Sequence, residues 1–220
     1  MGLFSLFLCV VFSHFALGGD RTAVWEKRWG DISQLLKLLE AVPEGKELIE
    51  KAVRKDPEFA SKIKIGRASF TETTFNRTYS LANGRERVSL EHDLTLNRAL
   101  SLADAVVDLA HELVHYNEKG MLDPYKSGFE VSRFIRSGIE GEGGELAALE
   151  MECKIAWSFE EKFEGFPEHR LCVRYKGAGH RFAKEVARLD YYAVGAWMEN
   201  LPPSLREKIP EISERASVFM

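Results

Sequence analysis

The sequence predicts an α+β fold in which helices precede and follow one small sheet. Residues 31–62 carry apolar side chains at helical spacing, residues 64–96 are partly alternating and rich in β-branched and aromatic side chains, and helical spacing returns after residue 98. This order of elements is typical of α+β domains. The chain has 220 residues, of which 45% are apolar, so it is long enough to bury one hydrophobic core.

The N-terminal segment has the pattern of a secretory signal peptide. Residues 1–19 contain no charged side chain, residues 3–12 are almost wholly apolar, and small residues at Ala16 and Gly18 come just before the first charge, Asp20. The apolar run is shorter than the roughly 20 residues that a membrane-spanning helix needs. We therefore predict a signal peptide at 1–18 and an exported domain at 19–220, periplasmic or secreted, with no stable membrane span.

Two helices are predicted before the sheet. Residues 31–42 form the first, with Asp31 as its N-cap and Pro43 after its end. Residues 45–62 form a second amphipathic helix, which the Asp56-Pro57 pair can split into two.

Three short segments are predicted to form an antiparallel sheet. They cover residues 64–74, 77–81 and 87–96, and each is rich in strand-forming side chains. Asn83-Gly84 lies between the last two segments and is a strong hairpin signal.

Helical spacing in the second half of the chain predicts four further helices. They cover residues 98–119, 127–138, 144–163 and 179–200, and Pro202-Pro203 follows the last one.

The charge balance disfavours nucleic acid as a partner. The chain has 30 basic and 34 acidic residues, which give a formal net charge of −4. A broad positive field for a polyanion is therefore not expected.

Two cysteines are left after removal of the signal peptide, Cys153 and Cys172. An exported protein meets an oxidising compartment, in which an even number of cysteines favours disulfide formation. We expect a bridge between them.

The segment DLAHELVHY at 108–116 carries the strongest functional signal. His111 and His115 are four residues apart, so on a helix both imidazoles reach one metal ion from the same face. Glu112 is rotated by about 100° from His111, which places it beside the metal, where it can accept a proton from water. The intervening positions are apolar, and two imidazoles in such surroundings need partners, which a metal ion supplies.

A catalytic zinc needs a third protein ligand and one open position. The segment EGEGGELAALEME at 140–152 offers Glu145 in the first turn of a predicted helix, where small alanines allow close packing against the HExxH helix. The remaining candidates are three other glutamates and one distant histidine: Glu140, Glu142, Glu150 and His180.

The pair of motifs HELVH and GGELAAL resembles the gluzincin branch of HExxH zinc metallopeptidases, over roughly residues 85–160. The resemblance implies a zincin-like fold, His111, His115 and Glu145 as zinc ligands, and Glu112 as general base. In that branch an edge strand before the catalytic helix holds the substrate, and residues 87–96 are the nearest strand here.

The third-ligand motif departs from the family pattern at one position. Leu149 replaces an aspartate, so another carboxylate must support a ligand histidine, with Asp108 and Glu150 as candidates.

The predicted activity is zinc-dependent hydrolysis of peptide bonds in proteins or cell-wall peptides. Zinc activates the water, and Glu112 accepts its proton. Candidates for a second oxyanion donor lie near the C-terminal helix: His180, Arg181, Tyr191 and Tyr192.

Two alternatives stay open on the same residues. One is an amide hydrolase or deacylase that acts on a cell-envelope substrate. The other is a non-catalytic envelope protein with structural zinc, for which Cys153, Cys172 or His180 would complete the ligand set.

Overall fold

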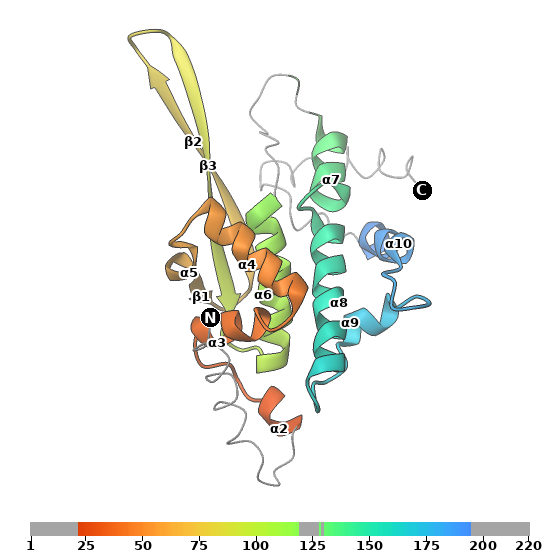
Figure 1. Cartoon of the computed structure of the whole chain (residues 1–220). Coiled ribbons are helices and arrows are strands. Elements are labelled where there is room, and N and C mark those ends of the chain that lie inside the picture. Colours follow the sequence, from red (N-terminus) through yellow and green to blue (C-terminus); the bar gives the residue numbers. More distant parts are fainter. Residues whose placement is uncertain (1–21, 119–127, 129, 195–220) are drawn as a thin grey trace.

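A small three-stranded sheet lies on one side of a group of helices in the computed structural model, which describes residues 22–118, 128 and 130–194 (Figure 1). The α+β class predicted from the sequence is therefore confirmed. Parts of the prediction lie outside the described residues: the signal peptide at 1–18, residue 119 of the predicted helix 98–119, residues 127 and 129 of the predicted helix 127–138, and residues 195–200 of the last predicted helix.

Three of the helices described before the sheet follow the predicted pattern, whereas the short helix at Thr22–Trp25 was not predicted. Their bounds are α2 Thr22–Trp25, α3 Ile32–Leu39, α4 Pro43–Lys55 and α5 Phe59–Lys62. Asp31 caps α3 as predicted, because its side chain accepts a hydrogen bond from the backbone N–H of Gln34 at 3.0 Å. The predicted split at Asp56-Pro57 is also present, and it separates α4 from α5.

The sheet differs from the prediction in the direction of one strand and in the strand boundaries, because residues 70–80 form one continuous strand across the predicted break at 75–76. Its strands are β1 Lys64–Gly66, β2 Phe70–Ser80 and β3 Arg85–Asn97, in the order β1-β3-β2. Strands β2 and β3 form the predicted antiparallel hairpin, but β1 is parallel to β3. The predicted single strand 64–74 is interrupted at residues 67–69, which turn around the end of β3, where the Asn97 N–H donates to Ser69 Oγ at 2.9 Å.

The central position of β3 corrects the expectation that residues 87–96 form the edge strand. Strand β3 has a neighbour on each side, whereas β2 and β1 are the two outer strands. The turn between β2 and β3 contains Gly84 at φ 64°, a backbone conformation that glycine adopts without steric cost. The far end of this hairpin extends beyond the helices (Figure 1).

The helices after the sheet include one that the sequence did not predict. Their bounds are α6 Leu102–Glu118, α7 Val131–Glu140, α8 Glu145–Lys162, α9 Arg170–Arg174 and α10 Lys184–Val194. Helix α9 has five residues, too few to give a periodic signal. Helix α10 begins at Lys184 rather than at 179, because residues 176 and 182 form an isolated bridge before it and His180 has φ 56°.

Helix α6 is the centre of the core. It packs against α8 on one side and against α3, α4 and β3 on others (Figure 1). Fully buried side chains from α6 and α8 fill the space between these elements: Leu109, Leu113, Ile155 and Phe159. Apolar burial of this kind is the main source of folding free energy and fixes the two helices relative to each other.

A disulfide joins α8 to α9. Cys153 and Cys172 are bonded, with their Cα atoms 5.1 Å apart, which confirms the predicted bridge. Among the described residues, none of the helices combines the length and the apolar character required to cross a membrane.

Candidate metal centre

Helix α6 presents two histidines side by side at its C-terminal half. His111 and His115 are one helical turn apart, and their Nε2 atoms are 3.2 Å from each other. His115 is only 5% exposed, and the side chain of His111 is 16% exposed. The two imidazoles therefore face one small, largely buried space.

Glu145 brings a carboxylate to the same space from the first turn of α8. Its Oε2 lies 3.5 Å from Nε2 of His111 and 3.6 Å from Nε2 of His115. A Cβ at Gly144 would lie 2.9 Å from the backbone oxygens of Gly138 and Ile139, so the turn that delivers Glu145 needs glycine there.

These three residues form a group that could hold a metal ion. Their ligand atoms all lie within 4.8 Å of one another. The structure therefore brings together the three residues that the sequence proposed as ligands, from two different helices.

The rival ligands lie elsewhere. Glu140 accepts a hydrogen bond from the Tyr192 hydroxyl at 2.6 Å, and Glu150 pairs with Lys154 at 2.7 Å. The remaining rivals are the exposed Glu142 and His180, whose ring stacks on Trp157 near the other end of α8.

The Nδ1 atoms of both histidines face hydrogen-bond acceptors. His111 Nδ1 is 2.8 Å from Glu152 Oε2, and His115 Nδ1 is 2.8 Å from the backbone oxygen of Gly143. Each Nδ1 must carry a proton to donate these bonds, so in the neutral rings the lone pairs are on the Nε2 atoms. Two lone pairs and the Glu145 carboxylate then face one another, and this arrangement requires a positive charge between them, either a proton or a metal ion.

The pKa values in the metal-free protein reflect the same need for positive charge. Burial lowers the pKa of His111, but hydrogen bonds with Glu145 and Glu152 outweigh burial and hold this pKa well above its ordinary value. Burial raises the pKa of Glu145, but hydrogen bonds with His111 and His115 outweigh that effect and hold it well below its usual range.

Glu152 is the carboxylate that contacts the candidate ligand His111, and it is not one of the two candidates proposed from the sequence. Asp108 and Glu150 were the candidates, but the Nδ1 atom of His111 lies against Glu152, which is 8% exposed. Glu152 follows Glu145 by seven residues, so two helical turns place both carboxylates on the same face of α8. This spacing is the signal that could have identified it.

Glu112 is buried beside the group without belonging to it. Its side chain is 6% exposed, and the Thr71 hydroxyl donates to its Oε2 at 2.7 Å. Thr71 lies on β2, one of the outer strands of the sheet, and its Oγ1 is also 3.1 Å from the backbone oxygen of Glu112. No local sequence pattern indicates this contact between β2 and the motif.

Asp108 is a second carboxylate on α6, one turn before Glu112. Burial raises the pKa of Asp108 to about 6, although a hydrogen bond with Ser69 acts in the opposite direction. Its Oδ2 is buried and has no hydrogen-bond partner. The protonated carboxyl is therefore favoured over a wider pH range than in an exposed aspartate.

Of the four candidates for an oxyanion donor, Tyr191 contacts a member of the group. Its hydroxyl donates to Glu145 Oε2 at 3.0 Å, and burial together with the charge of Glu145 raises the pKa of this phenol. The Tyr192 hydroxyl is directed to Glu140, Arg181 is exposed, and His180 pairs with Glu161 at 3.4 Å.

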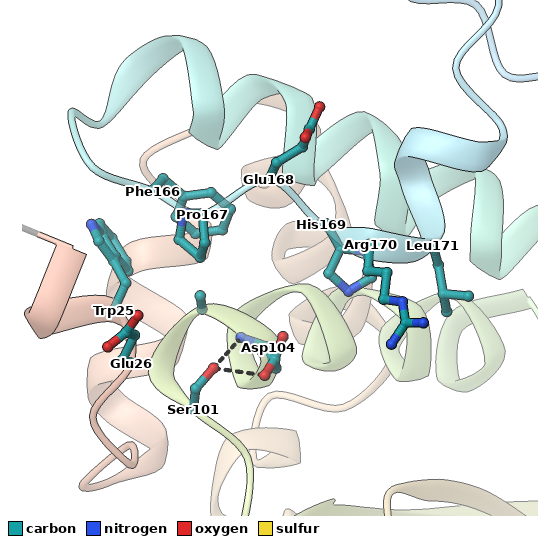
Figure 2. Close-up of a pocket in the computed structure, with 11 residues that line it drawn as sticks. Trp25, Glu26, Ser101, Asp104, Phe166, Pro167, Glu168, His169, Arg170 and Leu171 are labelled. Atoms are coloured by element: carbon teal, nitrogen blue, oxygen red, sulfur yellow. Dashed lines mark hydrogen bonds between the residues drawn. The ribbon is translucent and has the colours of Figure 1, made fainter.

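A pocket of about 410 Å³ lies at the opposite end of α6 from the two histidines (Figure 2). Its wall includes Ser101 and Asp104 at the start of α6, Trp25 and Phe166 from the core, and His169 at the start of α9. The pocket does not include the candidate metal-binding group of His111, His115 and Glu145.

Comparisons of the chain with protein-family profiles, with curated proteins and with solved structures find no match. The functional interpretation therefore depends on the geometry of the group and on its neighbours.

Proposed function

We propose that this protein is an exported, zinc-dependent metallopeptidase of the gluzincin type with a zincin-like fold. The observation that carries the proposal is the set of three electron-pair donors, His111 Nε2, His115 Nε2 and Glu145 Oε2, which face one another beside a buried glutamate. Both imidazoles are held in the tautomer that a metal ligand requires, by acceptors at Nδ1.

Zinc is the ion that this donor set suits best. Two imidazoles and one carboxylate with an open fourth position are a common ligand set of catalytic zinc. When bound, zinc would polarise the scissile carbonyl and lower the pKa of water.

The surroundings of Glu112 support its proposed role as the general base. It is adjacent in sequence to His111, is excluded from the ligand group and is held by the Thr71 hydroxyl. In the proposed reaction Glu112 accepts a proton from the attacking water and passes it to the leaving amine. Tyr191 fixes the carboxylate of Glu145 through its hydroxyl.

The position of β2 supports an extended peptide as the substrate. This strand is at the edge of the sheet, and its Thr71 contacts the proposed base directly. An edge strand can pair with the backbone of an extended peptide, which would place a scissile bond near Glu112.

Structural zinc is the weaker interpretation of the same residues. Cys153 and Cys172 are bonded to each other and are not available as thiolate ligands, and His180 is engaged with Trp157 and Glu161. A structural site usually has four protein ligands.

The disulfide also supports export to an oxidising compartment.

The test separates the base from the third ligand. Glu112→Gln should retain one zinc per chain and the native fold but lose hydrolysis of denatured casein or cell-wall peptides by orders of magnitude. Glu145→Ala should lose zinc affinity as well as activity, because two imidazoles alone are left. Glu150→Ala, at a solvent-accessible glutamate on the same helix, is the matched control and should change neither.

Two results would contradict the proposal. Full activity of Glu112→Gln would exclude the proposed hydrolytic mechanism, in which Glu112 is the general base. The deacylase alternative would be favoured if Glu145→Ala loses zinc and the wild-type protein cleaves acylated amides but not peptides.

A further inference from the structure

The carboxylate of Glu152 is shared between two histidines. Its Oε2 accepts the Nδ1–H of His111 at 2.8 Å, and its Oε1 lies 3.5 Å from Nε2 of His169. Glu152 itself is 8% exposed, and the side chain of His169 is 15% exposed. His169 therefore contacts the carboxylate that contacts the proposed ligand His111.

A buried carboxylate needs a partner for each oxygen. Neutral His111 supplies one N–H, which leaves Oε1 of Glu152 dependent on another donor. His169 supplies that donor as the neutral Nε2–H tautomer, in which Nδ1 carries no proton and lies in contact with Cys172 Sγ without donating to it. With both oxygens engaged, the carboxylate cannot rotate away from His111 without losing two contacts in a poorly hydrated site.

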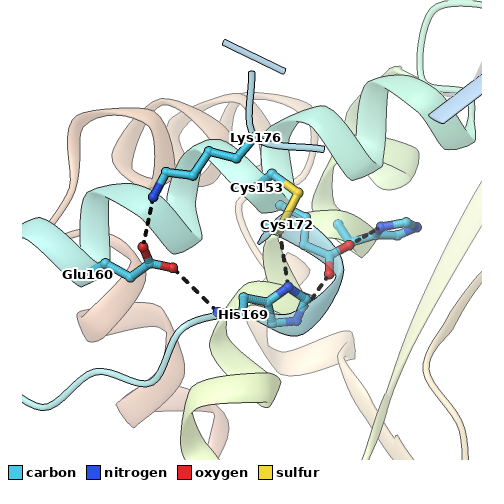
Figure 3. The surroundings of a disulfide bond; sticks show 7 residues. Cys153, Glu160, His169, Cys172 and Lys176 are labelled. Atoms are coloured by element: carbon cyan, nitrogen blue, oxygen red, sulfur yellow. Dashed lines mark hydrogen bonds and ion pairs between the residues drawn. A yellow bond between two sulfur atoms is a disulfide. The ribbon is translucent and has the colours of Figure 1, made fainter. Parts of the chain in front are cut away.

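The position of His169 is fixed by the segment around the disulfide (Figure 3). Its Nδ1 is 3.1 Å from Cys172 Sγ, and its backbone N–H donates to Glu160 Oε1 at 3.4 Å. The disulfide joins Cys172 to Cys153, the residue that directly follows Glu152 on α8. The same covalent link thus holds both ends of the contact between His169 and Glu152.

We propose that His169 is a positioning residue of the metal centre and that the Cys153–Cys172 disulfide keeps it in place. The inference rests on the proposed function, because it assigns His111 as a metal ligand. His169 touches neither the ligand group nor the proposed base. It acts through Glu152, which orients the ring of His111 so that Nε2 is directed at the metal site.

Metal binding provides a test that does not depend on hydrolysis. Removal of a residue that directly supports a ligand usually lowers metal affinity by about 10- to 100-fold. His169 is one contact further away, so His169→Ala should lower Zn²⁺ affinity by about tenfold, measured by competition with a chromogenic chelator. The visible spectrum of the Co²⁺-loaded protein should change as well, because the ring of His111 is less well oriented.

Two further substitutions distinguish positioning from general stability. His169→Gln retains an N–H donor and should restore a large part of the metal affinity and the wild-type Co²⁺ spectrum. His180→Ala removes a half-exposed histidine near the other end of α8 and should leave both properties unchanged.

The role of the disulfide is tested in a double-mutant cycle. The combined variant Cys153→Ser with Cys172→Ser has no thiol in the described region that could bind Zn²⁺ itself, and it should also show weaker metal binding. Adding His169→Ala to that variant should cause a much smaller further loss than in the bridged protein, because the two changes act on the same contact.

The outcomes separate this inference from the proposed function. If His111→Ala abolishes Zn²⁺ binding while His169→Ala leaves affinity and spectrum unchanged, the positioning role is wrong and the metal centre stands. A loss of thermal stability without a spectral change, not rescued by glutamine, would also overturn the positioning role. If the wild-type protein binds Zn²⁺ no better than His111→Ala, both proposals fail.

Discussion

The unusual environment of Asp108 predicts a pH-dependent cost to folding. This aspartate lies on α6, one turn before Glu112, and its buried Oδ2 has no hydrogen-bond partner. Asp108→Asn keeps one oxygen that can accept from Ser69 and replaces the other oxygen by a neutral amide group. The substitution therefore removes the buried negative charge with little change in shape.

The size and sign of the effect follow from the pKa. Burial raises the pKa of Asp108 from 3.8 to about 6, so the folded protein binds this proton more tightly than the unfolded chain does. The stability that the protonated Asp108 carboxyl contributes to the fold is fully present below pH 4, and it is lost as the pH rises from about 4 to about 6. A difference of roughly two pKa units corresponds to about 3 kcal/mol in the free energy of unfolding.

Urea denaturation of the metal-free protein at pH 4 and pH 8 measures this contribution directly. The free energy of unfolding of Asp108→Asn, compared with that of the wild type, should rise by about 3 kcal/mol between pH 4 and pH 8. The dependence of this free energy on urea concentration should be the same in both proteins. Asp93→Asn, at a solvent-accessible carboxylate on β3, is the matched control and should not show this gain. An equal difference between Asp108→Asn and wild type at both pH values would refute the argument from burial.

Three further substitutions probe the contact between β2 and the motif and the packing around glycines on α4 and α7. Thr71→Val removes the hydroxyl that holds Glu112 and should lower kcat about tenfold while zinc stays bound, as measured by steady-state peptide hydrolysis and metal analysis. Gly45→Ala should lower the free energy of unfolding by about 1–3 kcal/mol in urea titrations, because the new Cβ would lie 2.2 Å from the backbone oxygen of Leu39. Gly138→Ala, on a helix with open space around the new Cβ, should instead raise it by about 0.5–1 kcal/mol, and destabilisation there would contradict the packing argument.

The long amphipathic helices and the hairpin could be predicted because their signals are local. Helix α4 buries residues 45, 48, 49 and 52, which share one helical face, and Asn83-Gly84 determines where β2 and β3 turn. The direction of β1 could not be predicted in the same way. A strand of three residues carries no local signal for its partner, and its parallel pairing depends on how residues 67–69 turn around the end of β3.

The candidate site shows the same division between local and long-range information. His111 and His115 are related by helical spacing, and Glu145 begins the helix that packs beside them. Helical spacing also places Glu152 on this face, because it follows Glu145 by two helical turns. The gluzincin pattern, in contrast, has its acidic residue four positions after the ligand glutamate.

The contact of His169 with Glu152 depends on how the segment before α9 packs against α8. Its geometry is set by the disulfide and by Glu160, and no local spacing relates His169 to α6. Helical periodicity can thus identify donors that share one face, whereas the groups that orient those donors come from segments placed by tertiary contacts. A substitution at His169 should therefore affect metal binding even though the sequence around it resembles no metal motif.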